Sequence, residues 1–348
     1  MKRIILISFG IIVLLVLIIA WIFFGPATKF PESSRYLYVR DQPSGEVQIM
    51  RQVDTAHLIR NSSLFSFLAK QSKAWQRVKP GRFEIKKGES IFSLVRKLRN
   101  NSQSAVRLTV KKIRVREDLA HVIGRNFSSD SATAMNFLSN NDSLIGLGVD
   151  TNTVMTLVIP DTYFFNWNTS VKNILERLKN EEEKFWVKDD RRKKASSLNL
   201  TPNQVYTLAS IVEEETNKND EKGNIASVYY NRLNNGMKLQ ADPTVKYATR
   251  NFAAKRIYTT YLSTPSAYNT YLNYGLPPGP ICTPQTTTID AVLNMPRTDY
   301  LFFVARSDFS GYHQFSNNFA EHQKYARQYQ EVLNEWLKRD SLNKNSAH

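Results

Sequence analysis

The sequence predicts an α+β protein that has an N-terminal transmembrane helix, a small α+β domain and a larger mixed α+β domain. Three observations lead to this class. An uncharged apolar stretch covers residues 4–24, residues 34–104 alternate between strand and helix patterns, and residues 105–338 form a longer mixed segment. The chain of 348 residues is long enough to build two cores beyond the apolar stretch.

The stretch over residues 4–24 has the length of a membrane span. At about 1.5 Å per residue it extends over roughly 31 Å, which is close to the hydrocarbon thickness of a bilayer. Lys2 and Arg3 precede it, so residues 1–3 are expected in the cytoplasm. The body of the protein is then expected outside the cytoplasmic membrane, in the periplasm or its extracytoplasmic equivalent.

A cleaved signal peptide is the alternative interpretation of the same stretch. Signal peptides usually have an apolar core of about 7 to 15 residues and a cleavage site of small residues. Here the apolar run is longer, and it ends in the bulky residues of positions 21–24. We therefore expect a single-pass anchor in the cytoplasmic (inner) membrane, followed by a linker over residues 25–33.

Net charge and cysteine content restrict the function class. The net charge of +16 favours an anionic partner. No helix-turn-helix, zinc-finger or RNP-like pattern accompanies it, so we expect no nucleic-acid partner. Cys282 is the single cysteine, which excludes a disulfide within the chain.

The most regular part of the small domain, residues 34–104, is a turn, a strand and a helix. Residues 79–85 read as a turn followed by a strand, and a second turn at 87–89 leads to Ser90, which is suited to cap a helix. The apolar residues of that helix share one face: Ile91, Leu94, Val95 and Leu98. The pattern resembles a LysM-like module, which implies contact with an amino-sugar polymer; a generic strand-turn-helix unit is the alternative.

The larger domain begins with a β-rich stretch at 108–115. The charged run at 188–194 is expected to be a solvated helix end or loop without a function. Residues 300–315 predict a β-hairpin with a turn that ends at Gly311, and a packing helix follows from residue 319. Residues 339–348 are polar and are expected to be an unstructured tail.

A capped helix over 201–216 carries the first candidate site. Thr201 is a suitable N-cap, Pro202 occupies the first helical position, and Gln204 completes a capping box. At 100° per residue, four apolar residues fall within about 80° of Glu215 on the helical wheel. These residues are Val205, Leu208, Ile211 and Val212, while Glu213 and Glu214 lie on other faces.

A carboxyl group on an apolar face has to be neutralised, paired or functional. Burial raises its pKa, which is what a general acid near neutral pH requires. The alternatives are an ion pair of Glu215 with Lys218 or Lys222, or an apolar stripe that ends one turn earlier and leaves Glu215 in solvent. Periodicity alone does not separate these interpretations.

A series of ordered sequence blocks favours the functional interpretation. The blocks are Leu-Ala-Ser-Ile-Val-Glu-Glu-Glu-Thr at 208–216, Ala-Ser-Val-Tyr-Tyr-Asn-Arg-Leu at 226–233, Leu-Gln-Ala-Asp-Pro-Thr-Val at 239–245, Tyr-Asn-Thr-Tyr at 268–271, Gly-Leu-Pro-Pro-Gly-Pro-Ile at 275–281 and Gly-Tyr-His-Gln-Phe at 311–315. In this order they resemble the MltG-like (YceG-like) endolytic murein transglycosylases. The similarity covers most of 201–329 and is weaker in the LysM-like region and at Pro-Asp-Thr-Tyr, 160–163.

The resemblance implies that Glu215 is the catalytic acid. Family members cleave the β-1,4 bond between N-acetylmuramic acid and N-acetylglucosamine without water and leave a 1,6-anhydro sugar. One carboxyl group suffices for this reaction, whereas ordinary glycosidases use two carboxyl groups about 5 to 9.5 Å apart. The resemblance therefore implies a lyase that needs no cofactor and no metal. His313 and His322 lack a metal-ligand spacing, which agrees with this expectation.

Six further residues are candidates for substrate binding on the basis of the same blocks. They are Glu213, Gln240, Asp242, Asn269, Tyr271 and His313. An amide side chain suits sugar hydroxyl and acetamido groups, and a tyrosine ring suits a pyranose face, although turn and core hydrogen bonds are the alternative for each. Residues 157–159 are Leu-Val-Ile where the family has glycine and aromatic residues, so contacts near Asp161 are expected to differ.

Two other function classes remain open at this point. One is a non-catalytic wall-binding or division scaffold with the same fold, and the other is a hydrolase that releases reducing ends. The resemblance implies peptidoglycan glycan strands as the partner and termination of nascent strands as the role. Penicillin-binding peptidoglycan synthases are implied as protein partners in the same way.

Overall fold

The computed structural model describes residues 2–42, 44–254 and 257–345, and it confirms a mixed α+β protein with an N-terminal apolar helix. The chain divides into two compact units. Unit 1 consists of Met1–Leu108, Ile123–Asp130 and Tyr163–Ser170, and unit 2 consists of Thr109–Val122, Ser131–Thr162 and Val171–His348. Three two-stranded sheets, β1-β2, β3-β4 and β5-β6, make up the strand content of the described residues.

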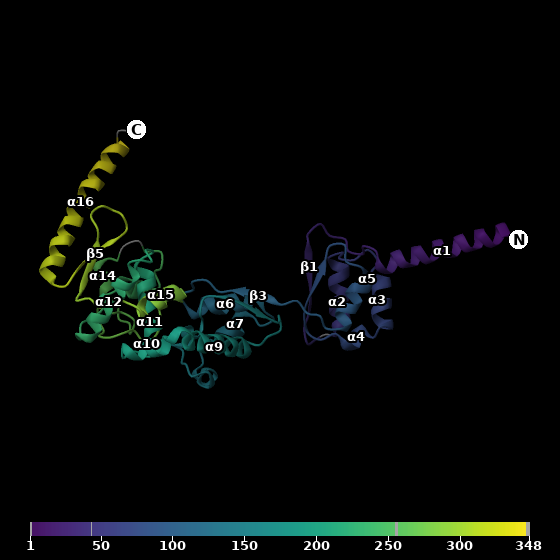
Figure 1. The fold of residues 1–348 in the computed structure, drawn as a ribbon, viewed down its shortest axis with the longest axis horizontal. Helices are drawn as coiled ribbons and strands as arrows, with labels where there is room; N and C mark the ends of the chain where they lie inside the picture. Colours follow the sequence, from purple (N-terminus) through teal and green to yellow (C-terminus); the bar gives the residue numbers. More distant parts are fainter. Residues whose placement is uncertain (1, 43, 255–256, 346–348) are drawn as a thin grey trace. The chain divides into compact units, whose positions relative to one another are not determined.

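Apart from the N-terminal apolar helix, the helices of unit 1 share one core with an antiparallel strand pair (Figure 1). In chain order its main elements are α1 (Lys2–Phe24), β1 (Ser34–Val39), α2 (Gly45–Thr55), α3 (Ser62–Gln71), α4 (Ala74–Arg77), β2 (Gly81–Lys86) and α5 (Ile91–Arg99). The register of β1 and β2 places Leu37 opposite Phe83, and both side chains are fully buried. The predicted turn, strand and helix are confirmed, because the Ser90 side chain accepts a hydrogen bond from the Ser93 N–H at the start of α5.

Residues 25–33 are not a free linker. Ala27 and Phe30 are buried in the core of unit 1. The Ala27 N–H donates to the Glu89 carbonyl at 3.1 Å, and the Lys29 N–H donates to the Leu58 carbonyl at 3.0 Å. Our expectation of a linker missed this, because the contacts that bury these residues come from distant parts of the chain.

Unit 2 is mostly helical. The paired strands β3 (Val106–Thr109) and β4 (Thr162–Phe165) each contain residues of both units, with Thr109 and Thr162 in unit 2. The next elements are α6 (Arg116–Asn126), α7 (Ser131–Leu138), α8 (Asn141–Leu144), η1 (Ile145–Leu147), η2 (Val154–Leu157), α9 (Val171–Val187), η3 (Lys188–Asp190) and α10 (Arg191–Ser197). The predicted strand at 108–115 is therefore too long. Beyond Thr109 its backbone bonds to loops instead, as when the Val110 N–H donates to the Asp161 carbonyl at 2.9 Å.

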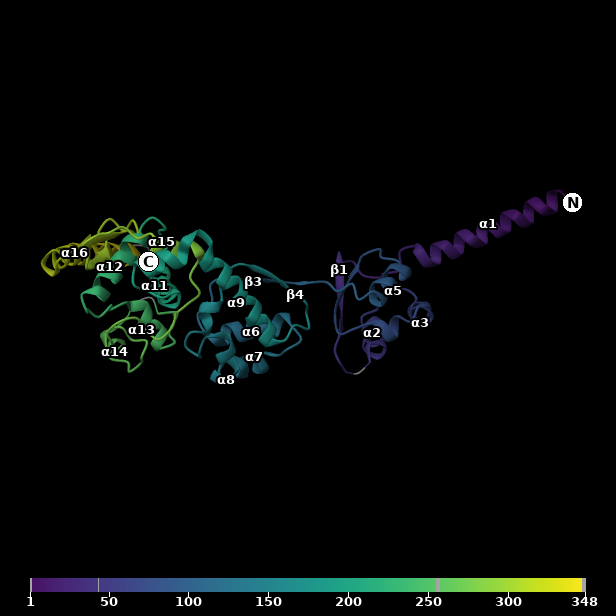
Figure 2. The same ribbon diagram turned by 60° about the horizontal axis from the view of Figure 1, so that its bottom comes forward.

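The centre of unit 2 is α11 (Pro202–Glu215), which is surrounded by neighbouring helices (Figure 2). The following elements are α12 (Lys222–Asn234), α13 (Asp242–Ala248), α14 (Thr259–Leu262), α15 (Thr286–Leu293), β5 (Phe302–Ala305), β6 (His313–Ser316) and α16 (Phe319–Asn345). The predicted hairpin is confirmed, because β5 and β6 pair antiparallel with Ala305 opposite His313. Helices α11, α12 and α15 share a common hydrophobic core.

Two expectations for unit 2 are wrong in part. The charged run at 188–194 is not wholly solvated, because Arg191 is buried and its Nε and Nη2 atoms contact the Asp290 carboxylate at 2.7 and 2.9 Å. The polar tail is not unstructured from residue 339, because α16 continues to Asn345. No glycine or proline interrupts residues 319–345, so the helix can propagate through polar sequence.

Candidate active site

Helix α11 begins with the predicted cap and ends at the candidate acid. The Thr201 hydroxyl accepts from the Gln204 N–H, and the Gln204 side chain accepts from the Thr201 N–H, so the capping box is confirmed. Every residue from Val205 to Glu213 is buried. The middle of the helix is thus enclosed on all sides, while its first turn and the two residues Glu214 and Glu215 at its end are partly accessible to solvent.

Glu215 is half-buried and lines a cavity of about 310 Å³. Its walls come from four helices and one strand: the C-terminal end of α11, the N-terminal end of α13, α12, α16 and β5. The segments before α13 and after α14 complete them. The lining residues are Glu215, Tyr229, Arg232, Leu239, Gln240, Asp242, Tyr271, Phe303 and His322. Four predicted site residues, Glu215, Gln240, Asp242 and Tyr271, are therefore brought together in one cavity.

The carboxyl group of Glu215 is bonded to a buried phenol. The Tyr229 hydroxyl donates to Glu215 Oε1 at 2.5 Å. Burial raises the pKa of Glu215 to about 7, and the charge of Asp242 acts in the same direction, whereas the Tyr229 hydrogen bond and the charge of Lys246 oppose the rise. Burial together with the Glu215 charge raises the pKa of Tyr229 well above its usual value, so this phenol stays protonated and keeps donating.

A second carboxyl group and a second phenol face the same cavity. The Tyr271 hydroxyl donates to Asp242 Oδ1 at 2.6 Å. Burial and this hydrogen bond raise the pKa of Tyr271, so it also acts as a donor at all ordinary pH values. Asp242 begins α13 and is exposed, which leaves its carboxylate accessible to a ligand.

Arg232 holds the cavity wall together and was not among the predicted site residues. Its guanidinium donates to the carbonyl of Leu301 at 2.7 Å, to the carbonyl of Leu239 at 2.8 Å and to Gln240 Oε1 at 3.3 Å. Arg232 lies three residues after Tyr229 on α12 and is itself buried. That spacing on an apolar helix face was the signal available in the sequence.

His322 also lines the cavity, although the sequence indicated only a packing helix at that position. Its ring stacks on Phe302 at 5.2 Å with an interplanar angle of 23°. Burial and the nearby Arg232 charge lower the pKa of His322, so the imidazole is neutral at pH 7. Its Nδ1 is buried and has no hydrogen-bond partner among the described residues.

Glu213 and Glu214 do not line the cavity. Glu213 is buried and pairs with Lys222 Nζ at 3.0 Å, with a further hydrogen bond from the Thr288 hydroxyl. Glu214 pairs with Lys112 at 2.6 Å and Arg114 at 3.1 Å. Lys222, considered as a partner of Glu215, is therefore engaged by Glu213, and the expected substrate contact of Glu213 is not supported.

Asn269 is likewise away from the cavity. Its side chain is fully buried, and its amide nitrogen donates to the carbonyls of Leu262 and Thr264, both at 2.9 Å. Its Oδ1 accepts from the Tyr271 N–H at 3.0 Å. The predicted sugar contact of Asn269 is thus replaced by a structural one, which fixes the loop that carries Tyr271.

His313 lines a neighbouring cavity of about 420 Å³ and not that of Glu215. The His313 ring atom Nδ1 lies 3.0 Å from Glu221 Oε2, and the His313 backbone N–H donates to Glu221 Oε1 at 2.7 Å. The ring of Phe303 has its centre 5.3 Å from the His313 ring and 5.8 Å from the Tyr229 ring, so a single aromatic residue contacts both sites.

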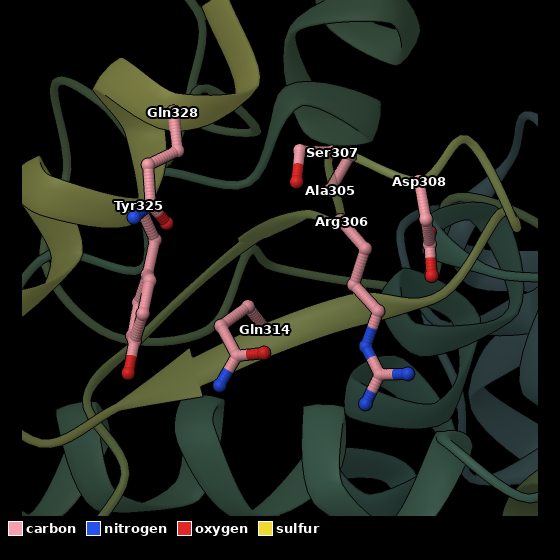
Figure 3. Close-up of a pocket in the computed structure, with 7 residues that line it drawn as sticks. All are labelled: Ala305, Arg306, Ser307, Asp308, Gln314, Tyr325 and Gln328. Carbon is pink, nitrogen blue, oxygen red and sulfur yellow. The ribbon is translucent and has the colours of Figure 1, made fainter. Parts of the chain in front are cut away.

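A third cavity of about 290 Å³ lies between the β5-β6 hairpin and α16 (Figure 3). Figure 3 shows Gln314 between Arg306 on one side and Tyr325 of α16 on the other. Its lining is polar and holds none of the predicted site residues. Within the described part of the chain, no group of three or more His, Cys, Asp and Glu side chains is placed to hold a metal ion.

The comparisons with known proteins agree with the ordered sequence blocks. A model of the YceG-like family matches residues 39–328. A Bacillus subtilis protein named endolytic murein transglycosylase is 36% identical over 181 residues, which are 51% of this chain and 48% of that protein. A Streptococcus pneumoniae protein of the same name is 27% identical over 323 residues, which are 84% of this chain and 58% of that protein.

The chain thus spans about half the length of the curated relatives it matches. A crystal structure of a putative YceG-like protein from Listeria monocytogenes superposes with a TM-score of 0.55 at 24% identity. The superposition covers 84% of this chain and 99% of that one, and it shows a shared fold.

Proposed function

The chain belongs to the YceG-like family, and from this premise we propose that it is an endolytic murein transglycosylase with Glu215 as its catalytic acid. The relatives named endolytic murein transglycosylase support the activity. The observation that carries the proposal is the half-buried Glu215 carboxyl group, with its pKa near 7, in a cavity wide enough for a sugar unit. Peptidoglycan glycan strands are the proposed substrate.

A pKa of about 7 suits Glu215 to act first as an acid and then as a base. At pH 7 the protonated and ionised forms are about equally populated. In the first step the protonated carboxyl group gives its proton to the glycosidic oxygen, and the bond from this oxygen to C1 of the N-acetylmuramic acid breaks. In the second step the carboxylate takes the proton of the C6 hydroxyl while O6 bonds to C1.

Together these two steps return Glu215 to its protonated form, consume no water and leave a 1,6-anhydro end. The Tyr229 hydroxyl donates to the carboxyl group throughout and stabilises the ionised form that exists between the two steps. We propose that Asp242, Tyr271 and Gln240 bind hydroxyl and acetamido groups of the flanking sugars, since all three line the cavity.

The carboxyl group of Asp242 is the observation that supports the hydrolase interpretation. A hydrolase would use Asp242 as a base for water or as a nucleophile, and Asp242 lies in the cavity of Glu215. The two reactions differ in their products, because hydrolysis leaves a reducing end and adds one water to the mass of the fragment. A scaffold would release no fragment at all.

Mass spectrometry of peptidoglycan fragments tests the proposal. The full chain in detergent micelles is incubated with purified glycan strands, beside Glu215→Gln and the matched neighbour Glu214→Gln. We expect anhydro-ended internal fragments from the wild type and from Glu214→Gln, and none from Glu215→Gln. Reducing ends, or an active Glu215→Gln protein, would contradict the mechanism, and inactivity of all three would favour a scaffold.

We propose further that α1 anchors the chain in the cytoplasmic membrane with the body on the outer side. The helix Arg3–Phe24 is apolar and uncovered by the rest of the structure, and the two basic residues Lys2 and Arg3 stand at its N-terminal end. In the same proposal β2 and α5 belong to a LysM-like module that contacts glycan. Termination of nascent strands beside penicillin-binding synthases remains an implication of the family.

A further inference from the structure

We propose that unit 1 carries a binding site for an anionic phospholipid of the membrane that α1 crosses. The site is a cavity of about 410 Å³ at the end of α1. Phe23, Phe24 and Phe92 form much of its apolar wall, and Arg96 and Arg99 belong to the same lining. This inference concerns unit 1 alone and does not depend on the cleavage chemistry.

The position of the cavity relative to the bilayer follows from the anchor. Phe23 and Phe24 are the last two residues of α1, whose length matches the hydrocarbon core, so they lie where the span ends. The rings of Phe24 and Phe92 are 5.1 Å apart, which joins the end of the anchor to α5. The packed residues after the anchor, such as Ala27 bonded to the Glu89 carbonyl, hold this arrangement.

One face of α5 combines an exposed aromatic ring with two exposed cations. Phe92, Arg96 and Arg99 are separated by four and three residues, so they form one stripe along the helix. Phe92 is 45% exposed, and Phe24 beside it is 64% exposed. Because the two rings lie side by side next to two cations, they form an apolar patch with a basic edge, which suits the interface of a membrane.

The two arginines are available for a ligand. Lys97 on the same helix is already paired with Glu89 at 2.8 Å. Among the side chains of residues 3–42, 44–254 and 257–339, none forms an ion pair or hydrogen bond with the guanidinium groups of Arg96 or Arg99. Guanidinium groups bind phosphate oxygens in pairs, so a phosphate above an apolar wall fits the stripe.

A phospholipid satisfies both halves of the site. Its acyl chain contacts the phenylalanine rings, and its phosphate lies between the arginines at the depth of the headgroups. A second copy of the chain would cover the rings but bring the same two cations against each other, which is unfavourable. The anionic lipid is therefore the occupant that the charges favour.

Native mass spectrometry of the lipid-free full chain in detergent tests the site. Phosphatidylglycerol or phosphatidylcholine is added in increasing amounts, and the retained lipid is counted for each protein. The variant is Arg96→Gln with Arg99→Gln, and the matched control is Arg51→Gln with Arg77→Gln, which removes the same charge from exposed positions on α2 and α4. Phe92→Ser tests the apolar half.

We expect the wild type and the control to retain phosphatidylglycerol in preference to phosphatidylcholine. Each arginine at an anionic membrane surface contributes about a fivefold gain in affinity, so the double variant should bind about twenty-five-fold more weakly. Phe92→Ser should weaken retention of both lipids.

Equal retention by the double variant and the wild type would overturn the proposal, as would equal affinity for the two lipids. A dimer that disappears in Phe92→Ser would assign the cavity to a second copy. If a polyprenyl diphosphate displaced phosphatidylglycerol at equal concentration, the cavity would be a site for a lipid-linked glycan, and the assignment to phospholipid would be wrong.

Discussion

Replacing Glu215 with glutamine is expected to stabilise the folded protein at alkaline pH. A carboxyl group whose pKa rises on folding favours the folded state only while it is protonated, and this advantage is lost as the pH rises through the folded-state pKa. For Glu215 the pKa rises from 4.5 to about 7, a difference of about 2.5 units. At about 1.4 kcal/mol per unit, the ionised group costs at most about 3.5 kcal/mol above pH 7, and glutamine removes this cost.

Thermal unfolding of the two proteins at pH 5 and pH 8.5 measures the effect. A domain of this size shifts by roughly 2 to 4 °C per kcal/mol, so Glu215→Gln should melt several degrees above the wild type at pH 8.5 and close to it at pH 5. Glu214 supplies a control of opposite sign. The ion pairs with Lys112 and Arg114 lower the pKa of Glu214 despite its partial burial, so Glu214→Gln should destabilise the protein most at pH 8.5. A Glu215→Gln effect that is independent of pH would refute the reasoning.

Three further predictions concern the neighbours of the acid. Tyr229→Phe removes a hydrogen bond that favours the ionised form of Glu215, so the pKa of Glu215 should rise by about one unit. The alkaline limb of the kcat/KM profile should then move to higher pH by the same amount, and a limb that does not move would exclude this role. Asp242→Asn should lower activity but leave every product anhydro-ended, since water is not activated in the mechanism; mass spectra that gain or lose reducing ends would show otherwise. Asn269→Ala leaves two partly buried carbonyls and the Tyr271 N–H without their partner and should lower the free energy of unfolding by about 2 to 4 kcal/mol in denaturant titrations. No such loss is expected in Asn273→Ala, because Asn273 is exposed to water.

The sequence correctly predicted the helix caps and the hairpin, because these elements depend on residues close together in the chain. The Thr201 capping box and the Ser90 cap depend on residues three positions apart, and both are present in the structure. The β5-β6 hairpin depends on two short strands and the turn between them. Such signals need no knowledge of the rest of the fold.

The helical wheel placed Glu215 correctly but for an incomplete reason. It assumed that α11 has one buried face, whereas residues 205–213 are buried on all faces. Glu213 was therefore placed on another face and named as a substrate-binding candidate, and it is in fact buried in an ion pair with Lys222. Periodicity describes a helix at a surface, and it loses its meaning for a helix that other helices surround.

The sequence did not predict the cavity residues that tertiary contacts bring next to Glu215. Arg232 and His322 reach the cavity from α12 and α16, which are far apart in the sequence. No spacing rule joins them to Glu215. Asn269 fell inside a family block and was taken for a ligand contact, but it bonds only to its own loop, a distinction that depends on where an amide group points.

The buried pair of Glu213 and Lys222 fixes the register of α11 and α12. Glu213 belongs to α11, Lys222 to α12 and Thr288 to α15, and the three side chains meet within the core. Sliding α12 by one turn along α11 would leave a carboxylate and an ammonium group unpaired in a dry interior, at a cost of several kcal/mol. Glu213 lies two residues before Glu215 on α11, and Lys222 lies seven residues before Tyr229 on α12. The pair therefore holds the Tyr229 hydroxyl opposite Glu215, although neither of its members lines the cavity.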